Sequence, residues 1–174
     1  MRRLVLLLAI STAITACKSA PKPESITFTE AMNRGVSDVH IYFPRPTTPP
    51  PPFKLFHQTD NTLTLVTKET ATDDEIAAIL YQFHDAATNH TFAALKLPQA
   101  FIDKRDPIVW FHLYRGPKCA PEKYTSPPPC GPSYHAAGDF TLGSFSNKDQ
   151  TDAALIQDEN HQTQLWNPNT PTNH

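Results

Sequence analysis

The stretch TDDEIAAILYQFHDAA, residues 72–87, decides the fold because it has the clearest helical periodicity in the chain. Thr72 and Glu75 have the spacing of a capping box, and the two aspartates between them suit the positive end of a helix. His84 and Asp85 fall outside the apolar stripe. The residues of this stripe recur at intervals of three and four positions and predict one buried helix face: Ile76, Ile79, Leu80, Phe83 and Ala87.

Segments on either side of this helix have the composition of β-strands. Residues 53–58 and 62–68 flank a polar turn and form the best hairpin candidate. Residues 108–114 carry bulky side chains on both faces, so we expect a central strand covered on both sides, with Trp110 and Phe111 in the core. Other strands are predicted at residues 26–28, 36–43, 91–97 and 140–145, and a short helix is predicted to begin at residues 153–156.

These elements predict a small, mainly-β domain of the α+β class. We expect five or six strands in a sandwich-like arrangement, with one packed amphipathic helix at about residues 72–87. A chain of 174 residues with 39% apolar residues is long enough for one domain with a modest core, which excludes wholesale disorder.

Proline is the compositional outlier, with 18 residues against only 5 glycines. The segment PRPTTPPPP, residues 44–52, ends in four consecutive prolines, which impose an extended polyproline conformation without amide donors. Such a segment is a candidate partner-binding element, because it docks in aromatic grooves at low entropic cost. The alternative is a stiff connection that resists proteases. The candidate residues are Pro49, Pro50, Pro51 and Pro52.

The first sixteen residues follow the order of a secretion signal. Arg2 and Arg3 form a positive start, and residues 4–14 form an apolar stretch shorter than the roughly 20 residues that span a bilayer. Small residues follow, and then comes Cys17. Subtracting the two arginines from the 15 basic residues leaves 13 against 17 acidic ones, scattered along the chain, which disfavours nucleic-acid binding.

The run Ile14-Thr15-Ala16-Cys17 resembles the lipobox of bacterial lipoproteins. The resemblance covers only these first 17 residues, and the family of the remaining chain is not recognised. It implies that a diacylglycerol is attached to Cys17, that the chain is cleaved before it, and that the new amine is acylated. Several acyl chains suffice for stable membrane anchoring. The alternative is an ordinary secretion signal with an incidental cysteine.

The resemblance also implies a location and a domain organisation. Lys18 stands where an aspartate would retain a lipoprotein at the inner membrane, so we expect the outer membrane, facing the periplasm, with surface exposure left open. We expect a signal peptide at residues 1–16, the lipidated cysteine and a short tether at residues 17–24, and a periplasmic domain at residues 25–166. A disordered tail is expected at residues 167–174.

Cys119 and Cys130 are the two cysteines that remain after lipidation. In an oxidising compartment they most simply form a disulfide, and their spacing matches neither C-x-x-C nor a zinc motif. A redox-active or metal-binding pair is the alternative. The proline-rich loop between them carries Glu122, Lys123 and Tyr124, which we select as candidate partner-binding residues because a braced loop binds with little ordering cost. A stiff connection that resists proteases is the alternative for this loop too.

Eight histidines suggest a metal site, but none has a spacing that fixes a shared helix face. His84, Asp85 and His90 are weak metal candidates, and surface or partly buried histidines are the simpler interpretation. Nucleophile motifs such as G-x-S-x-G and S-x-x-K are absent from the sequence. We therefore predict no cofactor and no catalytic residue.

Three functions remain open at this stage. The first is a non-enzymatic binding protein, such as an immunity or inhibitor lipoprotein or an envelope-assembly factor, with a protein partner and the membrane as its contacts. The second is a metal-dependent or hydrolytic envelope enzyme that uses His84, Asp85, His90 and His112. The third is a structural lipoprotein without a discrete site. Convergence of His84 and His112 in a cleft would favour the enzyme.

Overall fold

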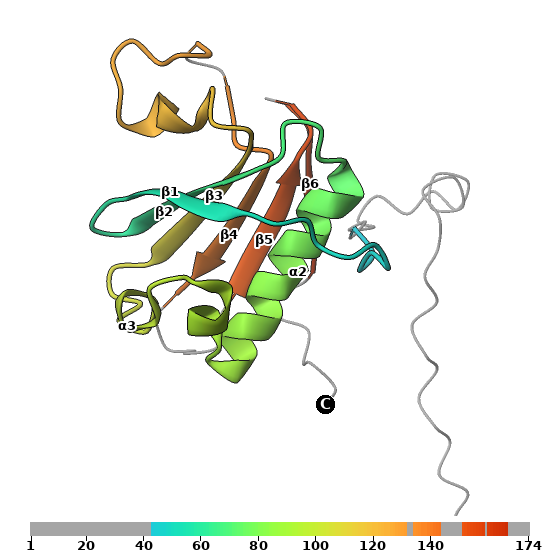
Figure 1. The fold of residues 1–174 in the computed structure, drawn as a ribbon, viewed down its shortest axis with the longest axis vertical. Coiled ribbons are helices and arrows are strands. Elements are labelled where there is room, and N and C mark those ends of the chain that lie inside the picture. The colour runs from blue at the N-terminus through green and yellow to red at the C-terminus, as the bar shows by residue number, and fades with distance from the viewer. Residues whose placement is uncertain (1–42, 132–133, 144–150, 159, 167–174) are drawn as a thin grey trace, which may run out of the picture. The chain divides into compact units, whose positions relative to one another are not determined.

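The computed structural model describes residues 43–131, 134–143, 151–158 and 160–166. Their main elements are one sheet and one long helix, α2, which lies along a face of that sheet (Figure 1). The elements in chain order are β1 (Lys54–Gln58), β2 (Thr62–Thr67), α2 (Asp73–Asn89), η1 (Phe92–Leu95), α3 (Gln99–Ile102), β3 (Val109–Arg115), η2 (Ala120–Lys123), β4 (Gly138–Leu142), β5 (Thr151–Ile156) and β6 (Gln162–Gln164).

The six strands lie in the sheet in chain order, from β1 to β6. Strands β2 and β3 are parallel and are connected through α2, and every other neighbouring pair is antiparallel. The predicted α+β class, with six strands and one packed helix, is confirmed. The second layer is the helix itself, in place of the second sheet that a sandwich-like arrangement would need.

Helix α2 begins where the sequence predicts. The Thr72 hydroxyl accepts a hydrogen bond from the Glu75 amide, and the Glu75 carboxylate accepts one from the Thr72 amide, so both halves of the capping box form. The whole predicted apolar stripe is buried. The Phe83 ring contacts Phe53 edge-on at 5.1 Å and also contacts Phe111 at 5.5 Å, and these rings anchor the helix in the core.

Two element predictions are wrong. Residues 91–97 contain the short helix η1 instead of a strand, and η1 is flanked by His90 and Lys96 in left-handed backbone conformations, with φ of 53° and 59°. Residues 153–156 belong to β5 instead of a helix. Their alanines favour a helix locally, but pairing with β4 and β6 overrides that preference.

The hairpin prediction is confirmed as β1 and β2, with a β-bulge between Leu55 and His57. The strand predicted at residues 140–145 is β4, which ends at Leu142. Among the described helices, none is long and apolar enough to cross a bilayer. The predicted signal at residues 1–16, Cys17, the tether at residues 18–24, the strand at residues 26–28 and the tail at residues 167–174 lie outside the described residues. Of the strand predicted at residues 36–43, only Phe43 is described, and it does not belong to a strand.

Strand β3 is central, as predicted, but it is not covered on both sides. Its α2-facing side chains, including Phe111, are fully buried in the core. On the other face Tyr114 is buried, whereas Trp110 is 40% exposed, which corrects the expectation that this tryptophan lies in the core. The sheet face opposite α2 is called the outer face below. This face is only partly covered, because Trp110 remains exposed on it.

Candidate functional site

The loop between the two cysteines, residues 119–130, is closed by the predicted disulfide. The Cα atoms of Cys119 and Cys130 lie 5.5 Å apart. Inside the loop the short helix η2 forms, and the Thr125 hydroxyl donates a hydrogen bond to the Pro121 carbonyl at 2.9 Å. These contacts and the prolines at positions 127–129 restrict the backbone of the loop.

A buried polar pair fastens this loop to the outer face. The Tyr114 hydroxyl on β3 donates a 2.6 Å hydrogen bond to Glu122 Oε1, and the Glu122 side chain is only 4% exposed. Burial raises the pKa of Tyr114, and the bond to Glu122 raises it further, so the phenol remains a donor at physiological pH. Glu122, a predicted partner-binding residue, is thus almost fully buried and holds the loop in place.

The side chains of Tyr124 and Lys123 are exposed on the surface of the loop. Tyr124 is 38% exposed, as expected for a residue outside the core, and its ring stacks on His57 of β1 with centroids 3.9 Å apart and planes at 25°. The Lys123 side chain is 47% exposed. The Lys123 ammonium group lies 3.7 Å from Glu122 Oε1, so it forms an ion pair with the residue that fastens the loop.

Beyond the loop, the outer face remains open over β3, β4 and β5. Strand register aligns Trp110, Thr141 and Asp152 in one row across the three strands. In the adjacent row, His112 Nδ1 and Asp139 Oδ1 lie 2.7 Å apart, and both side chains keep part of their surface in solvent. An exposed tryptophan therefore lies among polar groups that are already ordered.

The predicted proline segment, residues 44–52, lies close to the base of this loop. Pro49, Pro50 and Pro52 are exposed, and the Pro52 carbonyl accepts a 2.9 Å hydrogen bond from the Thr67 hydroxyl. Pro52 and Pro117 line the same shallow hollow of about 370 Å³, so the end of the proline segment meets the chain just before the loop there. The remaining lining residues are Phe53, Lys54, Val66, Thr67, Lys68, Glu69 and Gly116.

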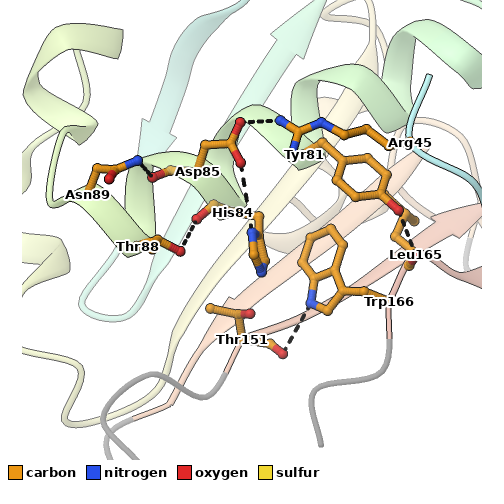
Figure 2. A network of polar contacts seen from close by, with 9 residues as sticks. All are labelled: Arg45, Tyr81, His84, Asp85, Thr88, Asn89, Thr151, Leu165 and Trp166. Carbon is orange, nitrogen blue, oxygen red and sulfur yellow. Dashed lines mark hydrogen bonds and ion pairs between the residues drawn. The ribbon is translucent and has the colours of Figure 1, made fainter. Parts of the chain in front are cut away.

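The weak metal candidates His84 and Asp85 lie on α2 within a separate polar network, shown in Figure 2. Asp85 forms an ion pair with Arg45, and His84 Nδ1 lies 4.0 Å from Asp85 Oδ1. The His84 ring packs edge-on against Trp166 with centroids 4.6 Å apart. Burial lowers the pKa of His84, partly offset by the Asp85 carboxylate, so this ring is neutral at pH 7.

The main effect of this network is to hold separate chain segments together. The Tyr81 hydroxyl lies within hydrogen-bond distance of two carbonyl oxygens, 2.9 Å from that of Phe43 and 2.8 Å from that of Leu165, and it can donate its proton to either one. It thereby joins the segment before β1 to the segment after β6, and Figure 2 shows the contact with Leu165. The Arg45 guanidinium lies 5.2 Å from the centre of the Tyr81 ring. Packing and hydrogen bonding within the protein account for the positions of these side chains.

The four residues proposed for an enzyme do not form one site. His84 lies on the helix, whereas His112 lies on the outer face, on the opposite side of the sheet. His90 is exposed at the end of α2, with its Nδ1 atom 3.8 Å from Asp103 Oδ1. Within the part of the chain that the structure describes, no group of three or more His, Cys, Asp or Glu side chains could hold a metal ion.

Comparison of the chain with protein-family models, with curated protein sequences and with solved structures gives no match. The candidate site is therefore interpreted from its own residues. Sequence reasoning missed Trp110, His57 and Asp139 as members of one surface. The alternation in residues 108–114, which puts Trp110 and His112 on the same face, was the available signal, because a polar residue on that face indicates solvent contact.

Proposed function

We propose that this chain is a lipid-anchored, periplasm-facing protein of the outer membrane that binds a protein partner without catalysing a reaction. The binding surface is the disulfide-closed loop, residues 119–130, together with the neighbouring outer face of the sheet. An immunity or inhibitor protein and an envelope-assembly factor are both consistent with such a surface. The lipid on Cys17 would hold the surface close to the membrane.

The observation that carries this proposal is the way Tyr124 is presented. Its ring is exposed, yet it is fixed by the stack on His57, by the disulfide and by the Tyr114–Glu122 hydrogen bond. Ordering a side chain on binding costs about 0.5–1.5 kcal/mol, and a residue that is already fixed avoids much of that cost. A loop with a purely structural role would have no need of an exposed, immobilised aromatic ring.

Site-specific photocrosslinking in the native host tests the partner. A photoreactive residue replaces Lys123 in the loop, and in a separate control it replaces Lys104, an exposed residue after α3. We expect one protein adduct from position 123 that is lost with Tyr124→Ala, and no such adduct from position 104. Absence of an adduct at 123, or equal adducts at both positions, would reject the proposed surface.

Mass spectrometry of the protein purified from that host tests the anchor separately. The expected N-terminus is Cys17, carrying a diacylglyceryl group and an amide-linked acyl chain. An uncleaved chain, or an unmodified Cys17 sulfur, would contradict the lipoprotein part of the proposal and leave the crosslinking result to stand by itself.

A further inference from the structure

We infer that the outer face over β3–β5 recognises an arginine side chain of the partner, held between the Trp110 ring and the carboxylates of Asp139 and Asp152. The inference rests on the proposed binding function, because it names the chemistry of the partner at the same surface. It follows from the exposure of Trp110, from the charge of this part of the face, and from carboxylate oxygens that remain available.

Trp110 provides an aromatic platform. It is one of three large hydrophobic side chains that are exposed among the described residues, and it lies on a central strand, where such a residue would normally be covered. The face of an indole ring attracts cations more strongly than that of any other side chain, and arginine is the commonest protein partner. The planar guanidinium can also stack flat on the ring.

The charged residues around Trp110 indicate that the ligand is positively charged. Thr141 separates Trp110 from Asp152 in one row, and Asp139 lies in the next row on the same face. The described residues of β3, β4 and β5 on this face include two aspartates and neither lysine nor arginine. A cation in this position would be attracted by the two carboxylates, whereas an anion would be repelled by both.

Both carboxylates are oriented and retain binding capacity. Asp139 uses Oδ1 to hold His112 at 2.7 Å, and Asp152 uses Oδ1 to accept a hydrogen bond from the Gln164 amide. Within the described residues the Oδ2 atoms of both carboxylates have no hydrogen bond. A guanidinium carries five N–H donors, so it can bond to a carboxylate oxygen while its plane covers the indole.

NMR titration of the mature lipoprotein in uncharged detergent micelles tests this inference without the partner. The probe is a glycine-flanked peptide with two arginines, and its matched control replaces both by citrulline, which has the same shape without the charge. The protein has two tryptophans, so Trp166, whose indole N–H lies 3.4 Å from the Thr151 carbonyl, serves as an internal reference. We expect the Trp110 indole N–H signal to shift and that of Trp166 to remain.

Variants then assign the charge. Asp152→Asn keeps an acceptor for Gln164 and should weaken arginine-peptide binding about fivefold, the effect of one exposed ion pair. Asp74→Asn, the same charge change on α2, should leave the affinity unchanged. An unmoved Trp110 signal, or an equal response to the citrulline peptide, would overturn the inference. Because no native partner is present, this result is independent of the crosslinking at position 123.

Discussion

Tyr124 stacks on His57 across 67 positions of sequence, with the two rings 3.9 Å apart. This contact joins the disulfide-closed loop to the edge strand β1 and fixes the orientation of the most exposed aromatic in the loop. Neither residue has another aromatic partner among the described rings. The contact is therefore a direct readout of whether the loop is seated on the sheet.

Removal of the disulfide should loosen the loop without unfolding the sheet. The double variant Cys119→Ser/Cys130→Ser loses a crosslink between two residues that are 11 positions apart in sequence. We expect the free energy of unfolding to fall by about 3 kcal/mol. Chemical denaturation measures the loss. The His57 ring signals in NMR should move toward unstacked values while the signals of α2 persist. Stability unchanged from wild type would contradict the bracing role of the disulfide.

The buried Tyr114–Glu122 pair should behave as an all-or-none unit. Tyr114→Phe leaves the buried Glu122 carboxylate without its hydrogen-bond donor, which we expect to cost about 1–3 kcal/mol of unfolding free energy. The double variant Tyr114→Phe/Glu122→Leu removes both polar groups and should be more stable than the single variant. Denaturant titrations of the two single variants and the double variant complete the cycle. Additive losses would mean that the two residues are independent.

Acidification should destabilise the network on α2 through His84. Burial lowers the pKa of His84 in the folded state below the value of 6.5 that applies to the unfolded chain. The unfolded state therefore binds a proton first as the pH falls below 6.5, and folding stability decreases over that range. The thermal midpoints of wild type and His84→Gln should converge between pH 7.5 and 5. Parallel pH profiles of the two proteins would show that His84 makes no such contribution.

Helix α2 packs tightly against β4 at Gly138. A Cβ atom there would lie 2.8 Å from both Ile76 Cγ2 and Leu80 Cδ1, so Gly138→Val must push the helix away from the sheet. We expect a loss of about 1–3 kcal/mol, measured by thermal unfolding. Ala154→Val, on the outer face of β5, is the matched control and should change stability little. Equal effects at the two positions would argue against close packing of α2.

The sequence by itself determined the elements whose signals are local. Helix α2, its capping box and its buried stripe follow from spacing, because side chains three and four positions apart share a helix face. The β1–β2 hairpin and the Cys119–Cys130 pairing were also predictable, because the turn between the strands is short and these are the only two cysteines besides Cys17. The strand at residues 153–156 could not be predicted, because pairing with the neighbouring strands outweighs the helix propensity of its alanines.

Tertiary structure alone decided which residues make up the proposed binding surface. Strand order and register place Trp110 beside Thr141 and Asp139 beside His112. Neither the strand order nor the register can be predicted from this sequence, because strand pairing is non-local. The disulfide loop covers only part of the outer face, so Tyr114 is buried while Trp110, on the same face of the same strand, stays exposed. Alternation specifies which side chains share a face, but the cover over that face is formed by residues distant in sequence.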